Sequence, residues 1–171
     1  PDLGDPLFSI WRMAWVAHQS VADPRHLFDA NIFFPDRGTL TYSDAMLLAV
    51  LPNGVLGLFG AHPDTAHQLL FLSAFIFSAT TAYVLGRSFA FDATGAWVAG
   101  LVFGFYSFRF EHYSHLELQL SGWMPIVLLA VHRIVMAGSG GLYVLAGGGA
   151  LAAQWYSSMY FGLFLSVYVA A

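Results

Sequence analysis

The chain has 171 residues, of which 58% are hydrophobic and only 9% are charged, and its formal net charge is −4. A soluble domain usually carries about 25% charged residues, so this composition excludes an ordinary water-exposed surface and predicts a chain embedded mostly in lipid. The small negative charge excludes nucleic acid as a partner, and the absence of cysteine excludes disulfides and thiolate metal sites. The absence of lysine, with abundant Ala and Gly, is typical of a GC-rich bacterial genome.

Residues 1–64 are expected to form a long external loop. Its first 43 residues hold half of the charged side chains of the chain, and Pro24 and Pro35 mark turns. Residues 7–17 are nevertheless rich in aliphatic and Trp side chains, which suits a helix lying in the membrane interface. The chain begins without Met and stops inside an apolar run, so we expect it to be a piece of a longer membrane protein.

Residues 45–60 are apolar but short, and Pro52-Asn53-Gly54 is expected to break them. If they cross the membrane, five arginines share one side and one lies on the other, which the positive-inside rule favours. If they do not cross, the division is four to two, and the first external loop lies on the same side as residues 109–120. We prefer the second alternative because the broken backbone would need neighbours to satisfy its polar groups.

The remainder of the chain predicts transmembrane helices, each about as long as a bilayer requires. The triple glycine at 147–149 is read as a point of close helix packing, since no Lys-Ser/Thr follows it as in a phosphate-binding loop. Polar residues near 154–158 favour a turn between two spans over one long tilted helix. The predicted spans are 65–86, 93–108, 121–136, 142–156 and 158–171.

The first polar cluster contains Asp5, Arg12, Arg25, His26 and Asp44. A carboxylate at a membrane surface can deprotonate or orient an acceptor hydroxyl, and arginines can hold a phosphate. For Asp5 an N-cap of the interfacial helix is the alternative role, since Asp favours that position and Pro6 suits the first turn.

The second polar cluster lies between two predicted spans and contains Glu111, His112, His115, Glu117 and Gln119. The spacing of its acids and histidines would place pairs on one helical face, where carboxylates and imidazoles suit a divalent cation. A solvated loop that caps the adjoining helices is the alternative.

The sequence also resembles the GT-C superfamily of multi-pass membrane glycosyltransferases, in particular the bacterial relatives of protein O-mannosyltransferases (glycosyltransferase family 39). The resemblance covers almost the whole chain. It rests on GDPLFSIWRMAWVAH, DPRHLFDANIFFP, TLTYSDAMLL, YSFRFEHYSHLELQLSGWMPIVLLAVHR and QWYSSMYFGLF.

This resemblance implies an all-α, polytopic transmembrane bundle with juxtamembrane helices in the long external loop, in the bacterial inner membrane. It implies a polyprenyl-phosphate sugar as donor, Asp5 as the essential acid, and the acids and histidines of the second cluster near the substrates. The first cluster lacks a paired Asp-Asp or Asp-x-Asp, so no metal or other cofactor is assigned, although a divalent cation at the second cluster stays open.

Two other functions are compatible with the sequence: a transporter or flippase of a lipid-linked substrate, and a non-catalytic protein of envelope assembly. Transporters place polar residues near the middle of the membrane. The predicted spans 65–86 and 93–108 have no charged residue inside them, which favours an interfacial active site. The sequence does not indicate the oligomeric state.

Overall fold

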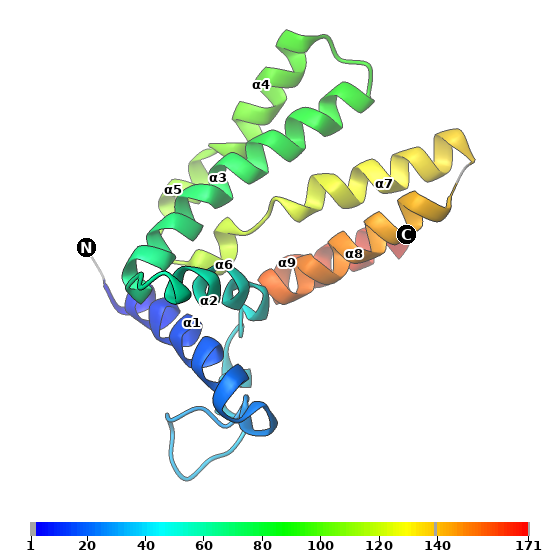
Figure 1. Ribbon diagram of the computed structural model, residues 1–171. Coiled ribbons are helices and arrows are strands. Elements are labelled where there is room, and N and C mark those ends of the chain that lie inside the picture. The colour runs from blue at the N-terminus through cyan, green and yellow to red at the C-terminus, as the bar shows by residue number, and fades with distance from the viewer. Residues whose placement is uncertain (1–2, 139, 171) are drawn as a thin grey trace.

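The computed structural model describes residues 3–138 and 140–170, and all regular secondary structure in these ranges is helical (Figure 1). Residues 1, 2 and 171, which belong to the predicted first loop and last span, lie outside the described residues. The α-helices are α1 (Gly4–Ala22), α2 (Val50–Leu58), α3 (Pro63–Ser88), α4 (Ala93–Gly104), α5 (Ser107–Glu111), α6 (Leu116–Gln119), α7 (Trp123–Ala137), α8 (Gly141–Ser157) and α9 (Met159–Ala170). Short 3-10 turns cover Pro24–His26, Thr39–Tyr42 and Leu47–Ala49.

Helix α1 lies within the predicted external loop and is amphipathic. Its buried residues Ser9, Arg12, Met13 and Val16 recur three or four positions apart, so they form one stripe along the helix. The helix begins at Gly4, and the preceding N-cap residue, Leu3, provides no side-chain hydrogen bond to it. Asp5 therefore lies inside the first turn, and its predicted role as N-cap is wrong.

The short apolar segment 45–60 differs from its prediction in one respect. Pro52, Asn53 and Gly54 do not break it but lie within α2, where Pro52 occupies the first turn and loses no intrahelical hydrogen bond. The helical stretch Leu47–Leu58 extends about 18 Å, against about 30 Å for a bilayer core. Its length agrees with the non-spanning alternative, and the side chain of Asn53 binds the Met13 carbonyl at 3.0 Å.

Helices α3 and α4 form a closely packed hairpin. A Cβ on Gly104 would lie 2.6 Å from the Cβ of Ala79, so a glycine is required for this approach. Asp92 caps α4 by accepting a hydrogen bond from the Gly95 amide at 2.7 Å. The predicted span 93–108 is wrong at its end, because α4 stops at Gly104 and the chain turns before α5.

Helices α7 and α8 form a second hairpin, and α9 folds back beside α8. Gly138, with a φ of 61°, ends α7 in the left-handed conformation that glycine adopts most easily. A Cβ on Gly147 would lie 2.7 Å from that of Ala130, which confirms close packing at the first of the three glycines. Helix α8 ends at Ser157 and α9 begins at Met159, so the predicted turn is confirmed and the single long helix is excluded.

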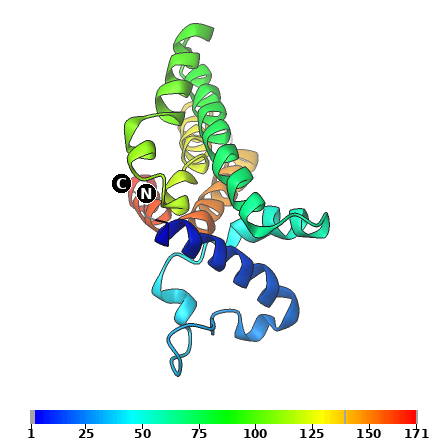
Figure 2. The ribbon, with the colours of Figure 1, turned by 90° about the vertical axis from the view of Figure 1, so that its left-hand side faces the viewer.

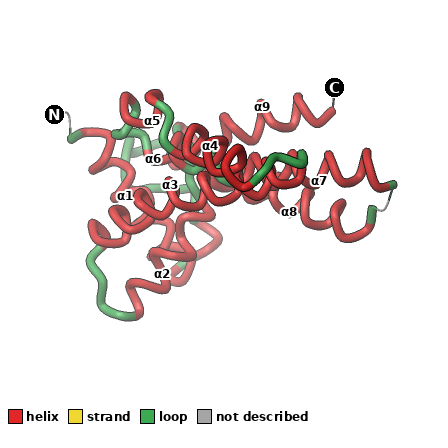
Figure 3. Tube along the Cα trace, turned by 90° about the horizontal axis from the view of Figure 1, so that it is seen from above, coloured by secondary structure: helices red, strands yellow, loops and turns green. Residues whose placement is uncertain are grey.

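The two hairpins diverge from a common base that contains α1, α2, α5 and α6 (Figures 1 and 2). Viewed from above, α1 and α2 lie to one side of α3, and α7 to α9 extend away on the other (Figure 3). Two stretches of the described chain are long and apolar enough to cross a membrane, Pro63–Ser88 and Leu116–Met136. Charged residues lie in the base, in the loop between α1 and α2, and near the hairpin tips, where Arg87 and Asp92 flank the turn between α3 and α4.

Candidate active site

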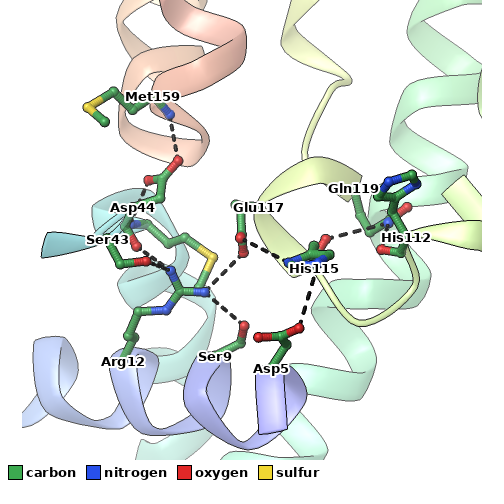
Figure 4. A network of polar contacts seen from close by, with 11 residues as sticks. Asp5, Ser9, Arg12, Ser43, Asp44, His112, His115, Glu117, Gln119 and Met159 are labelled. Carbon is green, nitrogen blue, oxygen red and sulfur yellow. Dashed lines mark hydrogen bonds and ion pairs between the residues drawn. The ribbon is translucent and has the colours of Figure 1, made fainter. Parts of the chain in front are cut away.

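The two polar clusters of the sequence meet in the base of the molecule. Residues from α1, the segment after Tyr42, α6 and the start of α9 converge there (Figure 4). We call this set the polar junction: Asp5, Ser9, Arg12, Ser43, Asp44, His115 and Glu117.

Arg12 lies at the centre of the polar junction and is 2% exposed. Its Nη1 donates to the Ser43 hydroxyl at 2.9 Å and to the Asp44 carbonyl at 2.7 Å. Its Nη2 donates to the Ser9 hydroxyl at 2.9 Å and to Glu117 Oε2 at 3.0 Å. One guanidinium thus joins three segments that are far apart in the sequence.

Three further side chains extend this network toward the surface. Glu117 Oε1 lies 3.6 Å from His115 Nδ1, and His115 Nε2 lies 3.6 Å from Asp5 Oδ2. These separations are ion-pair distances, longer than a hydrogen bond. Side-chain exposure rises from 2% at Arg12 and 12% at Glu117 to 39% at His115 and 49% at Asp5. The chain of ionic contacts therefore runs from the buried guanidinium of Arg12 to Asp5, whose carboxylate is accessible to solvent.

Asp44 connects the first loop to the last hairpin. Its Oδ2 accepts a hydrogen bond of 2.7 Å from the Met159 amide at the N-terminus of α9, and its Oδ1 accepts one of 3.3 Å from the Met46 amide. Burial raises the pKa of Asp44 above its ordinary value, and the two amide hydrogen bonds oppose that shift. Asp44 is 5% exposed, so it holds α9 in place and does not face a substrate.

Arg109 and Gln119 shape the loop that carries His115. Arg109 is fully buried; its Nη2 donates to the Gln119 carbonyl at 2.6 Å, and its guanidinium lies 4.3 Å from the centre of the Phe75 ring. Gln119 Nε2 in turn donates to the carbonyl of His112 at 2.8 Å. Burial lowers the pKa of the Arg109 guanidinium from its ordinary value.

The sequence pattern placed Arg109 beside the second polar cluster without assigning it a role, and it did not single out Ser9. Ser9 lies three residues before Arg12 on the buried stripe of α1, so helical spacing was the signal that could have found it. For Arg109 the flanking residues Phe108 and Phe110 were the available signal, because aromatic side chains on both sides are compatible with a packed guanidinium.

Several predicted site residues do not join the polar junction. Arg25 is exposed and His26 pairs with Asp23 at 2.7 Å, both beyond the far end of α1, which is about 28 Å long. Glu111 is exposed, and no described contact links its side chain to the polar junction. His112 stacks on Phe108 with ring centres 4.0 Å apart, so in this conformation it supports the loop.

The charges and donor atoms of the polar junction limit its chemistry. Arg12 faces the interior with its Nη atoms engaged, which does not suit the phosphate-binding role predicted for it. Among the described residues no group of three His, Asp or Glu side chains has the arrangement of a metal site. Asp5 and His115 are the accessible groups that can accept a proton.

A pocket of about 410 Å³ adjoins the polar junction between α5, α6 and α9. His115 and Glu117 form its polar wall, and aromatic side chains such as Phe108, Tyr160 and Phe164 form the rest. A mainly apolar cavity with a few convergent polar groups is typical of small-molecule sites. Comparisons with known protein families, with curated proteins and with solved structures found no significant match for this chain.

Proposed function

We propose that the chain is part of a multi-pass, GT-C-type glycosyltransferase of the bacterial inner membrane. It transfers a sugar from a polyprenyl-phosphate donor to an envelope glycan, lipid or protein acceptor at the external face. Asp5 is the group that activates the acceptor hydroxyl.

The distribution of apolar surface supports a membrane location. Only 28% of the most apolar window of α3 is buried, and 33% of that of Leu116–Met136, although their mean hydropathies are 1.8 and 1.4. A helix this apolar in the core of a soluble protein would be mostly buried, whereas here most residues of each window are at least partly exposed. The outward faces suit lipid contact, with α4, α8 and α9 completing a polytopic bundle.

The observation that carries the proposed activity is the pairing of Asp5 with His115 across 3.6 Å. It joins the polar segment before the first hairpin to the polar segment between the hairpins. Substrates drawn from the membrane would reach an accessible carboxylate there, beside a pocket of about 410 Å³.

The reaction requires one base and one leaving group. Asp5 accepts the proton of the acceptor hydroxyl while that oxygen forms a bond to the anomeric carbon of the sugar. The bond from this carbon to the phosphate oxygen breaks, and its electron pair leaves with the polyprenyl phosphate. Because Arg12 is buried and Arg25 is distant, we assign the donor phosphate to groups outside the polar junction.

The test is Asp5→Asn, which keeps size and polarity but accepts no proton at neutral pH. Membranes containing the full protein are incubated with a panel of radiolabelled polyprenyl-phosphate hexoses and pentoses. We expect transfer to fall at least 100-fold, the range of a lost general base. The exposed Asp36→Asn is the matched control and should transfer normally.

Full activity of Asp5→Asn in correctly inserted protein would overturn the assignment. If the unaltered protein carries lipid-linked sugar across proteoliposomes without transferring it, the transporter alternative replaces the proposed function. Inactivity of the unaltered protein in both assays would favour a non-catalytic assembly protein.

A further inference from the structure

We infer that His115 takes the proton from Asp5 and passes it to solvent, and that Glu117 and Arg12 are positioning residues that hold His115 for this step. The inference rests on the proposed function and adds a second proton-transferring residue to it. It concerns the part of the catalytic cycle after Asp5 has been protonated.

The order of charges in the chain of contacts supports this role. Asp5, His115, Glu117 and Arg12 follow one another through separations of 3.6, 3.6 and 3.0 Å. When His115 is protonated the four groups alternate as negative, positive, negative and positive, and their charges cancel. When His115 is neutral the same groups carry a net charge of −1. An imidazolium formed by proton transfer to the ring would therefore lie between two carboxylates, which complement its charge.

The two ring nitrogens of His115 have different surroundings. Nδ1 faces Glu117, which is mostly buried and held by Arg12, so we assign the proton of the neutral ring to Nδ1. Nε2 then presents its lone pair to Asp5. The partners of Glu117 thus determine which nitrogen is free to accept the catalytic proton.

The other charged and titratable groups described near His115 are not placed to accept the proton from Asp5. The His112 ring centre lies 6.2 Å away, and its Nδ1 contacts the Phe108 carbonyl at 3.0 Å. From α9, Tyr160 lines the adjoining pocket. Asp44 is bound to the Met159 amide and is buried, so it faces α9 and not the imidazole.

The proton balance is complete without a further reactant. Asp5 becomes a neutral carboxylic acid when it takes the hydroxyl proton of the acceptor. Transfer of that proton to Nε2 restores the Asp5 carboxylate and forms an imidazolium between two carboxylates. Since 39% of the His115 side chain is exposed, water can then remove the proton and reset both groups. The 3.6 Å separation must shorten to about 3 Å for transfer, as catalytic contacts commonly do when substrate binds.

The experiment is chemical rescue of His115→Ala in the full protein, with the same polyprenyl-phosphate sugar panel. We expect transfer to fall about 10- to 100-fold and to be restored at least fivefold by added imidazole. Pyrazole, which has the same shape but is a much weaker base, should not restore it. A merely structural role for the ring would respond equally to both compounds. His18→Ala, an exposed histidine of α1, is the matched control and should need no rescue.

A second variant examines the positioning residues. Glu117→Gln keeps an oxygen that can accept from Nδ1 but removes the charge that stabilises the imidazolium. We expect the turnover number to fall about tenfold with little change in KM, because a positioning role for Glu117 affects proton transfer through His115 more than substrate binding. Size-exclusion chromatography in detergent checks that the variant remains folded.

The outcomes separate the two proposals. If Asp5→Asn abolishes transfer but His115→Ala is fully active, or is rescued equally by pyrazole, the relay is overturned and the proposed function stands. If the unaltered protein transfers no sugar, both are overturned.

Discussion

The polar junction and the two helical hairpins bury side chains of opposite kinds. In the α3/α4 hairpin, Gly104 and Ala79 let two apolar helices approach until their backbones nearly touch. In the polar junction, a buried arginine is surrounded by hydroxyl, carbonyl and carboxylate oxygens. Close packing of small side chains stabilises the α3/α4 hairpin, whereas hydrogen bonds and an ion pair stabilise the polar junction. Substitutions should therefore have different consequences in the two regions.

The hairpins and the polar junction also differ in the substitutions that they tolerate. The outward faces of the hairpins make few specific contacts, so many side chains would satisfy them. In the junction, each polar group needs a specific partner, because an unpaired buried charge costs several kcal/mol. The residues that can accept protons, Asp5 and His115, lie where this paired interior reaches the surface.

The largest expected effect is on the stability of the junction. Arg12→Met leaves Glu117 mostly buried without its cation, and we expect the free energy of unfolding to fall by about 3–5 kcal/mol. SDS-induced unfolding in mixed micelles measures this. Arg25→Met, at an exposed position, is the control and should stay within about 0.5 kcal/mol of the unaltered protein.

A double substitution sharpens that result. Arg12→Met combined with Glu117→Met removes both charges, so no carboxylate remains unpaired, and the loss should be smaller than for Arg12→Met alone. Equal losses for the single and double variants would show that the ion pair contributes nothing specific to the junction.

An intermediate effect is expected in the α3/α4 hairpin. Gly104→Ala places a methyl group 2.6 Å from the Cβ of Ala79, and such overpacking costs about 1–3 kcal/mol. Gly148→Ala in α8 is the matched control, because no atom lies within 4 Å of its added Cβ. Helix propensity alone predicts that the control gains up to about 1 kcal/mol. Equal effects at the two glycines would contradict the close approach of α3 and α4.

The smallest effect is expected at Asp44 and appears in the pH dependence of stability. Burial raises the pKa of Asp44 above 3.8, so the folded protein binds this proton more tightly than the unfolded chain. The stability of the unaltered protein relative to Asp44→Asn should therefore be greatest below pH 3.8 and fall as the pH rises through the raised value. Unfolding of both proteins at a series of pH values measures the difference. If the stability of the unaltered protein relative to Asp44→Asn instead increased with pH, burial would not be the dominant influence on the pKa of Asp44.

The sequence by itself determined most of the helical architecture. The long, uncharged and mainly apolar stretch within α3, the glycine that ends α7 and the polar residues before α9 are local signals that act within a few residues. The same local chemistry placed the polar residues between the apolar helices, since charged groups are costly in an apolar environment.

Only the tertiary structure decided which polar residues act together. Arg12 and Glu117 are 105 residues apart, and no periodicity connects them. The end of α4 at Gly104 also lies where α4 packs closely on Ala79 of α3, a contact that the local sequence does not show. Arg25 and His26 have the same composition signal as Arg12, yet the 19-residue length of α1 carries them to the opposite end. Residue type indicated which side chains could do chemistry, and the long-range pairing of Arg12 with Glu117 brought Asp5, His115 and Glu117 together.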